Sequence, residues 1–186
     1  MELSGPDWVS KFPPSKSLDA LIEPMRTGAT QFVAALRAAG ATVMVADTLR
    51  PPQRAYLMHY SFLIARQGLD PATVPAMAGV DIQWVHVDAA GAADVAASKA
   101  AAEKMVQTYG VVFLPVLNSR HTEGRAVDMD ILWPGTLNVA RADGTMAAIA
   151  STPRTGAANV ELHAVGATYG VIKLVTDAPH WSADGH

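Results

Sequence analysis

Two short polar stretches of the sequence combine side chains that bind metal ions. The first covers residues 119–128 and contains His121 and Asp128, and the second covers residues 177–181 and contains His180. A neutral imidazole and a carboxylate are both ligands of zinc, so these three side chains form a candidate ligand set. Three protein ligands leave the fourth tetrahedral position for water, which is typical of a catalytic rather than a structural zinc site.

The residues around these ligands indicate a tight local backbone. Gly124 permits a close turn between the histidine and the carboxylate of the first stretch. The small side chain of Ala126 lets another backbone pack close to it. Pro179 prevents helix formation and stiffens the approach to His180. We therefore expect the two stretches to bring their side chains together on one cation.

Asp177 lies three residues before His180 and is a candidate general base. A free carboxylate at this place can take a proton from water and pass it to a leaving amine. The alternatives are ordinary structural roles. Asp128 and Asp177 can cap an element or form a surface salt bridge, and His180 can be a hydrogen-bonded histidine stacked near Trp181. Spacing alone leaves these alternatives open.

Hydrophobic periodicity predicts the elements that must position these residues. Helices are expected over residues 19–39, 51–66, 97–109 and 156–169, and strands over 41–46, 128–132, 137–141, 145–150 and 171–175. Pro24 lies within the first helix and can delay its start. Residues 142–144 predict a hairpin turn, and residues 69–96 are expected to be mostly loop, with a short strand within 80–87. Residues 111–117 are expected to be extended.

Composition bounds the class of protein. The chain has 186 residues, of which 50% are hydrophobic and 17% charged, so we expect one folded α+β domain over residues 1–186. Within it, residues 1–18 are expected to be an irregular N-terminal segment. The net charge of −3 argues against a nucleic-acid partner. With no cysteine in the chain, a metal site must use His, Asp and Glu.

The sequence shows neither a targeting segment nor an apolar run long enough to span a membrane. We therefore expect synthesis in the cytoplasm without a signal peptide, and no membrane partner. A protein of this kind reaches targets outside the cytoplasm only if another system releases it.

Three blocks of the sequence resemble the LAS metallopeptidases, the group named for lysostaphin, D-Ala-D-Ala metallopeptidases and sonic hedgehog. Residues 119–128 fit the signature S-x-H-x-x-G-x-A-x-D. Residues 177–181 are similar to the D-x-P-H-aromatic element of phage endolysins that cut the L-alanyl-D-glutamate bond. Residues 48–54 resemble the segment in which an arginine-containing turn opens a helix. The blocks follow the family's order over about residues 45–182.

The resemblance implies a small antiparallel sheet with flanking helices, as in the hedgehog and D,D-peptidase fold. It also implies that His121, Asp128 and His180 bind zinc and that Asp177 is the catalytic base. Arg50 would be a second catalytic residue, binding substrate and stabilising the oxyanion with its permanently charged guanidinium.

Two further residues are implied to bind substrate. Ser119 would hydrogen-bond the substrate or a ligand, and Gln53 would face the site. Without the family, Arg50 is expected to be a surface arginine at a helix start, and Gln53 is as well explained by solvent exposure.

The resemblance implies a zinc peptidase that hydrolyses peptidoglycan stem peptides and acts on the cell wall after release. The bond cut is that of an L-Ala-D-Glu endopeptidase or of a D-Ala-D-Ala carboxypeptidase of VanY type. The alternative is a non-catalytic zinc-containing binding module of the same fold. Residues 69–96 and 135–153 look longer than a minimal endolysin core, and no cell-wall-binding module is recognisable. Both departures from the family bear on which substrate the protein acts on and on its biological role, and not on the metal site.

Overall fold

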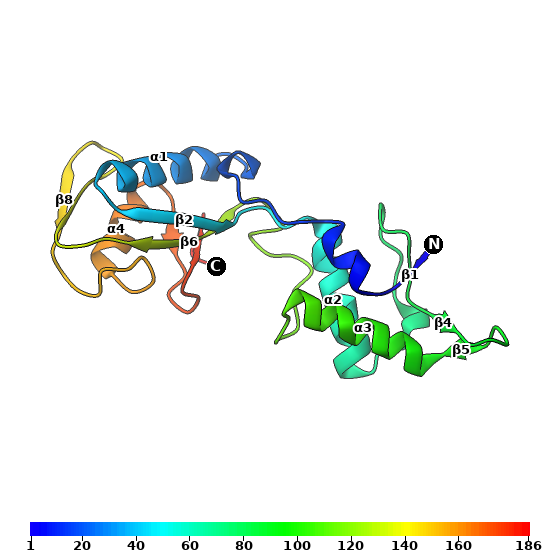
Figure 1. The fold of residues 1–186 in the computed structure, drawn as a ribbon. Helices are drawn as coiled ribbons and strands as arrows, with labels where there is room; N and C mark the ends of the chain where they lie inside the picture. Colours follow the sequence, from blue (N-terminus) through cyan, green and yellow to red (C-terminus); the bar gives the residue numbers. More distant parts are fainter. The chain divides into compact units, whose positions relative to one another are not determined.

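A computed structural model describes all residues from 1 to 186 and confirms the α+β class (Figure 1). The chain forms two compact units, each built from two segments. The first unit comprises residues 1–13 and 51–118, and the second unit comprises residues 14–50 and 119–186. The single domain expected over residues 1–186 stays a prediction. No helix combines the length and the apolar character needed to cross a membrane.

The second unit is built on a four-stranded antiparallel sheet in the order β2-β6-β10-β9. Its strands are β2 (Thr42–Asp47), β6 (Ala126–Leu132), β10 (His180–Ser182) and β9 (Ile172–Lys173). The strands expected at 41–46, 128–132 and 171–175 are confirmed, with the last one shorter than expected. No strand is predicted at β10, because three residues are too few to show a pattern.

Alternation along β6 separates a core face from a polar face. Val127, Met129 and Ile131 are at most 1% exposed and pack in the core of the second unit. Successive side chains of a strand point to opposite faces, so Asp128 and Asp130 lie on the other face. The apolar pattern of this strand therefore directs the carboxylate of Asp128 away from the core.

Helix α1 (Met25–Ala38) and helix α4 (Val160–Thr168) belong to the same unit. Helix α1 begins after Pro24, as the proline indicates, and it lies along β2 (Figure 1). Helix α4 begins later than the expected residue 156. The backbone N–H of Gly156 bonds the carbonyl of Ile131 (2.8 Å), and the side chain of Asn159 caps the helix by accepting from Leu162 N–H (3.0 Å).

The hairpin expected around residues 142–144 is present. Strand β7 (Leu137–Ala140) pairs antiparallel with β8 (Met146–Ile149). Leu137, Val139 and Ile149 are at most 1% exposed, so the hairpin contributes one apolar face to the same core as α1 and β6. The 3₁₀ helix η2 (Leu18–Ala20) precedes α1.

The first unit is built on the helix pair α2 (Pro52–Gln67) and α3 (Val95–Tyr109), which pack side by side (Figure 1). Both helices end at their predicted glycines, Gly68 and Gly110. The remaining elements are short: η1 (Pro6–Ser10), η3 (Pro71–Thr73), the parallel pair β1 (Glu2–Leu3) and β3 (Ile82–Gln83), and the antiparallel pair β4 (His86–Val87) and β5 (Ala93–Asp94).

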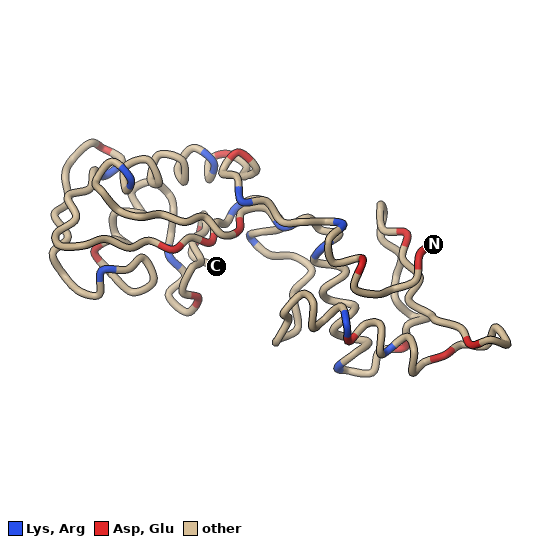
Figure 2. The backbone as a smooth tube through the Cα atoms, viewed as in Figure 1, with Lys and Arg blue, Asp and Glu red and all other residues tan.

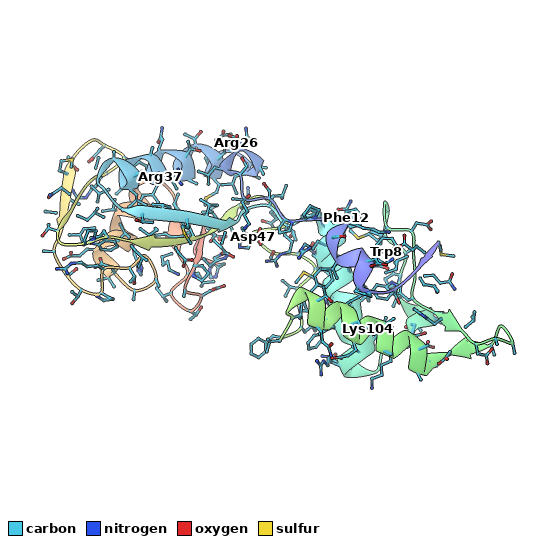
Figure 3. All side chains as sticks on the ribbon, viewed as in Figure 1. Trp8, Phe12, Arg26, Arg37, Asp47 and Lys104 are labelled. Atoms are coloured by element: carbon cyan, nitrogen blue, oxygen red, sulfur yellow. The ribbon has the colours of Figure 1, made fainter.

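The segment 1–18, expected to be irregular, contains β1 and η1 and begins η2. Trp8 is 4% exposed and belongs to the core of the first unit, with Phe12 packed against that core (Figure 3). Burial of these aromatic side chains gives the segment a defined structure that its prolines and polar residues do not indicate. Residues 111–117 form no strand, and Phe113 within them is 83% exposed.

Charged residues are interspersed along the backbone of both units, without a long run of one sign (Figure 2). Their electrostatic effects are therefore local, and the charges that matter for a site are those in direct contact with it.

Candidate metal centre

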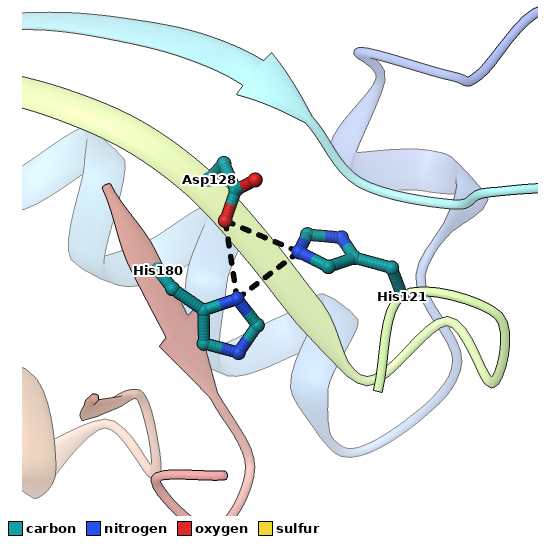
Figure 4. Close-up of side chains that lie close together, drawn as sticks. All are labelled: His121, Asp128 and His180. Atoms are coloured by element: carbon teal, nitrogen blue, oxygen red, sulfur yellow. Dashed lines mark hydrogen bonds and ion pairs between the residues drawn. The ribbon is translucent and has the colours of Figure 1, made fainter. Parts of the chain in front are cut away.

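Three side chains of the second unit converge on one point (Figure 4). His121 Nε2 lies 3.1 Å from Asp128 Oδ1 and 3.1 Å from His180 Nδ1, and these last two atoms lie 3.2 Å apart. His121 is 5% exposed and His180 is 7% exposed. The three residues predicted as metal ligands thus form a group that could bind a metal ion.

Sheet register brings Asp128 and His180 together. His180 on β10 is the direct cross-strand partner of Asp128 on β6, and Trp181 pairs with Val127 on the opposite, core-facing side. Cross-strand partners point to the same face, with their Cβ atoms about 5 Å apart. Burial of Trp181 and Val127, both 0% exposed, therefore fixes the face on which the histidine and the carboxylate meet.

The loop before β6 supplies His121 and is fastened to the turn that follows β2. The backbone N–H of Arg50 donates to the carbonyl of His121 (3.1 Å), and the His121 ring contacts the carbonyl of Thr48 through Nδ1 (3.0 Å). Gly124 has a φ of +69°, and a Cβ there would lie 3.4 Å from the carbonyl oxygen of Ala20. The tight turn expected at this glycine is confirmed.

Backbone carbonyls fix the tautomers of both histidines. Because a carbonyl only accepts, the nitrogen that faces it must carry the proton. His121 Nδ1 therefore donates to Thr48, and His180 Nε2 donates to the carbonyl of His186 (3.1 Å). In the neutral rings, the lone pairs of His121 Nε2 and His180 Nδ1 point at each other and at Asp128. Histidine ligands of metals have this outer-shell arrangement.

The spacing of the three atoms fits a small cation. Ligands about 2.0–2.2 Å from a tetrahedral zinc lie about 3.4 Å from one another. The observed separations of 3.1–3.2 Å are close to this value. Three acceptor atoms at this distance repel one another unless a positive charge lies between them, so the residues fit a metal ion.

The pKa values show that the site favours positive charge. Burial lowers the pKa of His121, but the hydrogen bond that a protonated Nε2 donates to Asp128 and the negative charge of Asp128 outweigh it, so the pKa is raised above its ordinary value. Burial alone would raise the pKa of Asp128, but the two histidines hold it well below its usual range. Asp128 is therefore a carboxylate at neutral pH, as a metal ligand must be.

Arg50 lies next to the ligands without contacting their metal-facing atoms. Its guanidinium pairs with Asp47 Oδ2 (3.2 Å), and the side chains of Arg50 and Asp47 are 24% and 16% exposed. Asp47 Oδ1 is buried and has no hydrogen-bond partner. The negative charge of Asp47 also contributes to the raised pKa of His121. Asp47 therefore orients the guanidinium of Arg50, and part of the Arg50 side chain stays exposed.

Asp177 is exposed, and its carboxylate makes no hydrogen bond or ion pair. Its backbone carbonyl accepts from His180 N–H (3.1 Å), so it belongs to the turn that leads into β10. The Ser119 hydroxyl accepts from Thr122 N–H (3.3 Å) and thereby caps the loop of His121. Gln53 lies in the first turn of α2, in the first unit. The substrate-binding roles of Ser119 and Gln53 stay predictions.

Two charged residues of this region are not predicted from the sequence. Asp47, the partner of Arg50, ends a strand and is indistinguishable in sequence from a turn aspartate. Lys173 is 7% exposed in β9, where its ammonium binds backbone carbonyls of the segment that leads to His180. The available signal is one charged residue within the apolar run 171–175.

We expect His163 to make the second unit less stable in acid. Burial lowers the pKa of His163, the charge of Lys173 lowers it further, and a hydrogen bond to the carbonyl of Gly156 (2.9 Å) opposes both. Because the folded pKa is below the unfolded value, stability is full above about pH 6.5 and falls as the pH drops toward the folded pKa. Thermal unfolding of the metal-free protein between pH 7.5 and 5.5 should show a smaller acid loss in His163→Gln than in the wild type. An equal loss in both proteins would contradict this expectation.

No family model, no curated protein and no solved structure matches the chain. The proposal below therefore rests on the sequence motifs of the chain and on the geometry of the three converging side chains.

Proposed function

We propose that this chain is a zinc-dependent peptidase that hydrolyses peptidoglycan stem peptides, as its resemblance to the LAS metallopeptidases implies. The observation that carries the proposal is the convergence of His121 Nε2, Asp128 Oδ1 and His180 Nδ1 within 3.2 Å, with both histidine lone pairs directed at the same point. This convergence involves the same three residues that match the family's ligand motif.

Zinc is the metal that this ligand set favours. Two imidazoles and one carboxylate are ligands of catalytic zinc sites, whereas magnesium and calcium prefer sets made of oxygen alone. When bound, zinc acts as a Lewis acid that makes water nucleophilic near neutral pH and polarises a carbonyl.

The residues beside the ligands supply the remaining chemistry. The free carboxylate of Asp177 takes the proton of the attacking water and returns it to the departing amine. The guanidinium of Arg50, oriented by Asp47, donates hydrogen bonds to the carbonyl oxygen on which negative charge develops. Both side chains belong to the second unit, as do the three ligands.

Two stem-peptide bonds are candidates. The D-x-P-H-W element of residues 177–181 favours the L-Ala-D-Glu bond, as in phage endolysins. A carboxypeptidase reaction on D-Ala-D-Ala is the other candidate, because the same fold family includes such enzymes. Either activity places the working protein at the cell wall, which it reaches after release from the cytoplasm.

Mass spectrometry of purified peptidoglycan after incubation with the zinc-loaded protein tests the proposal. We expect new stem-peptide fragments whose masses identify the bond, and no fragments with Asp177→Ala. Walls of several chemistries should be used. Zinc binding without fragments from any wall would contradict the peptidase proposal and favour the zinc-containing binding module.

We expect Arg50→Lys to weaken catalysis and leave zinc binding unchanged. Lysine keeps the charge but loses the guanidinium fork, and a hydrogen bond to a charged group contributes about 1.5–3 kcal/mol, or roughly 10- to 160-fold in kcat/KM. Steady-state kinetics on the identified stem peptide measures this effect. The exposed Arg26, with the same substitution, is the matched control in the same unit. An Arg50→Lys enzyme with wild-type kcat/KM would remove Arg50 from the mechanism.

A further inference from the structure

Lys173 is a buried cation at a core-facing position of the sheet, where an apolar side chain is expected. It is 7% exposed and is the cross-strand partner of Trp181, which faces the core. Val171, on the same face of the chain, is 0% exposed. A buried ammonium is costly unless every donor is satisfied, so its presence at this position needs a specific partner.

The partner is the backbone of residues 174–180. The ammonium of Lys173 donates to the carbonyls of Leu174, Asp177 and His180, the last at 3.1 Å. An ammonium has three N–H donors, so all of them are used. The acceptors include the candidate base and one candidate ligand.

The same three carbonyls also join the loop into a ring of backbone hydrogen bonds. Asp177 N–H donates to Leu174, His180 N–H donates to Asp177, and Leu174 N–H donates to His180, at 3.1–3.2 Å. A carbonyl has two lone pairs, so each can accept one bond from the ring and one from the ammonium. The ammonium therefore binds all three acceptors of the ring at once.

The ring of backbone hydrogen bonds holds His180 at the end of the loop 174–180. The same loop is also attached to β6, because Met129 N–H donates to the carbonyl of Pro179 (2.9 Å). The loop is thus held at Lys173 and at β6, and in this position His180 Nδ1 lies 3.2 Å from Asp128 Oδ1.

We propose that Lys173 is the positioning residue of the metal centre: its buried ammonium closes the loop 174–180 and thereby presents His180 Nδ1 to the cation. This inference rests on the metal-binding part of the proposed function. It does not require that the chain hydrolyse any particular bond.

The test compares zinc affinity with folding in Lys173→Met, which keeps an unbranched chain one atom shorter and removes the donors. We expect the zinc Kd, measured by competition with a chromogenic chelator, to rise about 10- to 100-fold, as for other outer-shell changes at metal sites. The circular dichroism of the metal-free variant should stay that of the wild type. Lys173→Arg, which keeps charge and donors, should recover much of the affinity.

Two control variants separate positioning from stability. Lys16→Met makes the same change at an exposed lysine of the second unit, and Ile149→Val weakens the core of that unit away from the loop. Both should keep the wild-type zinc Kd. The visible spectrum of the Co²⁺-loaded proteins gives a second readout. The intense bands of four-coordinate cobalt should be retained in both controls and weakened in Lys173→Met.

Should Lys173→Met fail to fold, amide hydrogen exchange of the wild type decides. Zinc should then increase the protection of the amides of Leu174, Asp177 and His180. An unchanged zinc Kd in a folded Lys173→Met would overturn the positioning role of Lys173 and leave the proposed function standing. Unchanged protection of the amides of Leu174, Asp177 and His180 would do the same. A wild-type protein that binds no zinc would overturn both this inference and the proposed function.

Discussion

Asp177→Asn is expected to lower kcat on the stem-peptide substrate by about 10²- to 10⁴-fold, the usual contribution of a positioned general base. The amide has nearly the same shape but cannot take a proton from water. The carboxylate of Asp177 makes no hydrogen bond or ion pair, so its replacement should leave the fold intact. It is also outside the group of converging ligand atoms, so the zinc Kd should stay within about twofold of the wild type.

Asp130→Asn is the matched control for this variant. Asp130 is an exposed aspartate of β6 in the same unit, and its carboxylate has no partner. We expect this control to keep wild-type kcat and zinc affinity. Full activity in Asp177→Asn would exclude Asp177 as the base, and a parallel loss of zinc would assign it to the metal site instead.

His180→Ala is expected to raise the zinc Kd by more than about 100-fold, because changes in the outer shell alone cost 10- to 100-fold. Zinc at 100 times its Kd should stabilise the wild type by about 2.7 kcal/mol, and the variant should show no such gain. Differential scanning calorimetry with zinc and with excess chelator measures both effects. The peptidase activity of the variant should fall with its zinc content.

His163→Ala controls for the loss of a partly buried histidine in the same unit. The His163 ring stacks edge-on against Trp181, with the centroids 5.5 Å apart, so its removal also costs stability. It contributes no atom to the converging group. We expect this control to unfold at a lower temperature and to gain as much from zinc as the wild type. Equal zinc stabilisation in His180→Ala would show that the metal binds elsewhere.

The elements that the sequence predicts well are those with a long apolar pattern or a strong stop signal. Helix α2 begins at Pro52 and is followed by Gly68, as the sequence indicates, and β6 shows its alternation clearly. Short elements escape such patterns. Strand β10 has three residues and is defined by its pairing with β9, across the loop 174–179, and with β6, which is distant in the sequence. Tertiary pairing therefore determines it.

The candidate site likewise has parts that a sequence pattern predicts and parts that only tertiary contacts define. His121, Asp128 and His180 are identifiable because their types and neighbours match a motif, and the structure brings them together. The groups that orient them are mostly backbone atoms, such as the carbonyls of Thr48 and His186. Any residue type supplies a carbonyl, so no sequence pattern can reveal these partners. The same holds for the ring of carbonyls that Lys173 binds, because only the folded loop brings them together.

X-ray absorption spectroscopy at the zinc edge tests the metal centre most directly. One equivalent of zinc is added to the metal-free protein, and the spectrum is compared with that of zinc-loaded His180→Ala. The wild type should show nitrogen and oxygen neighbours at about 2.0–2.2 Å, with the multiple scattering of two imidazoles, and the variant should lose one imidazole. A wild-type spectrum that shows six oxygen neighbours and no imidazole, or a spectrum unchanged in the variant, would contradict a zinc centre at His121, Asp128 and His180.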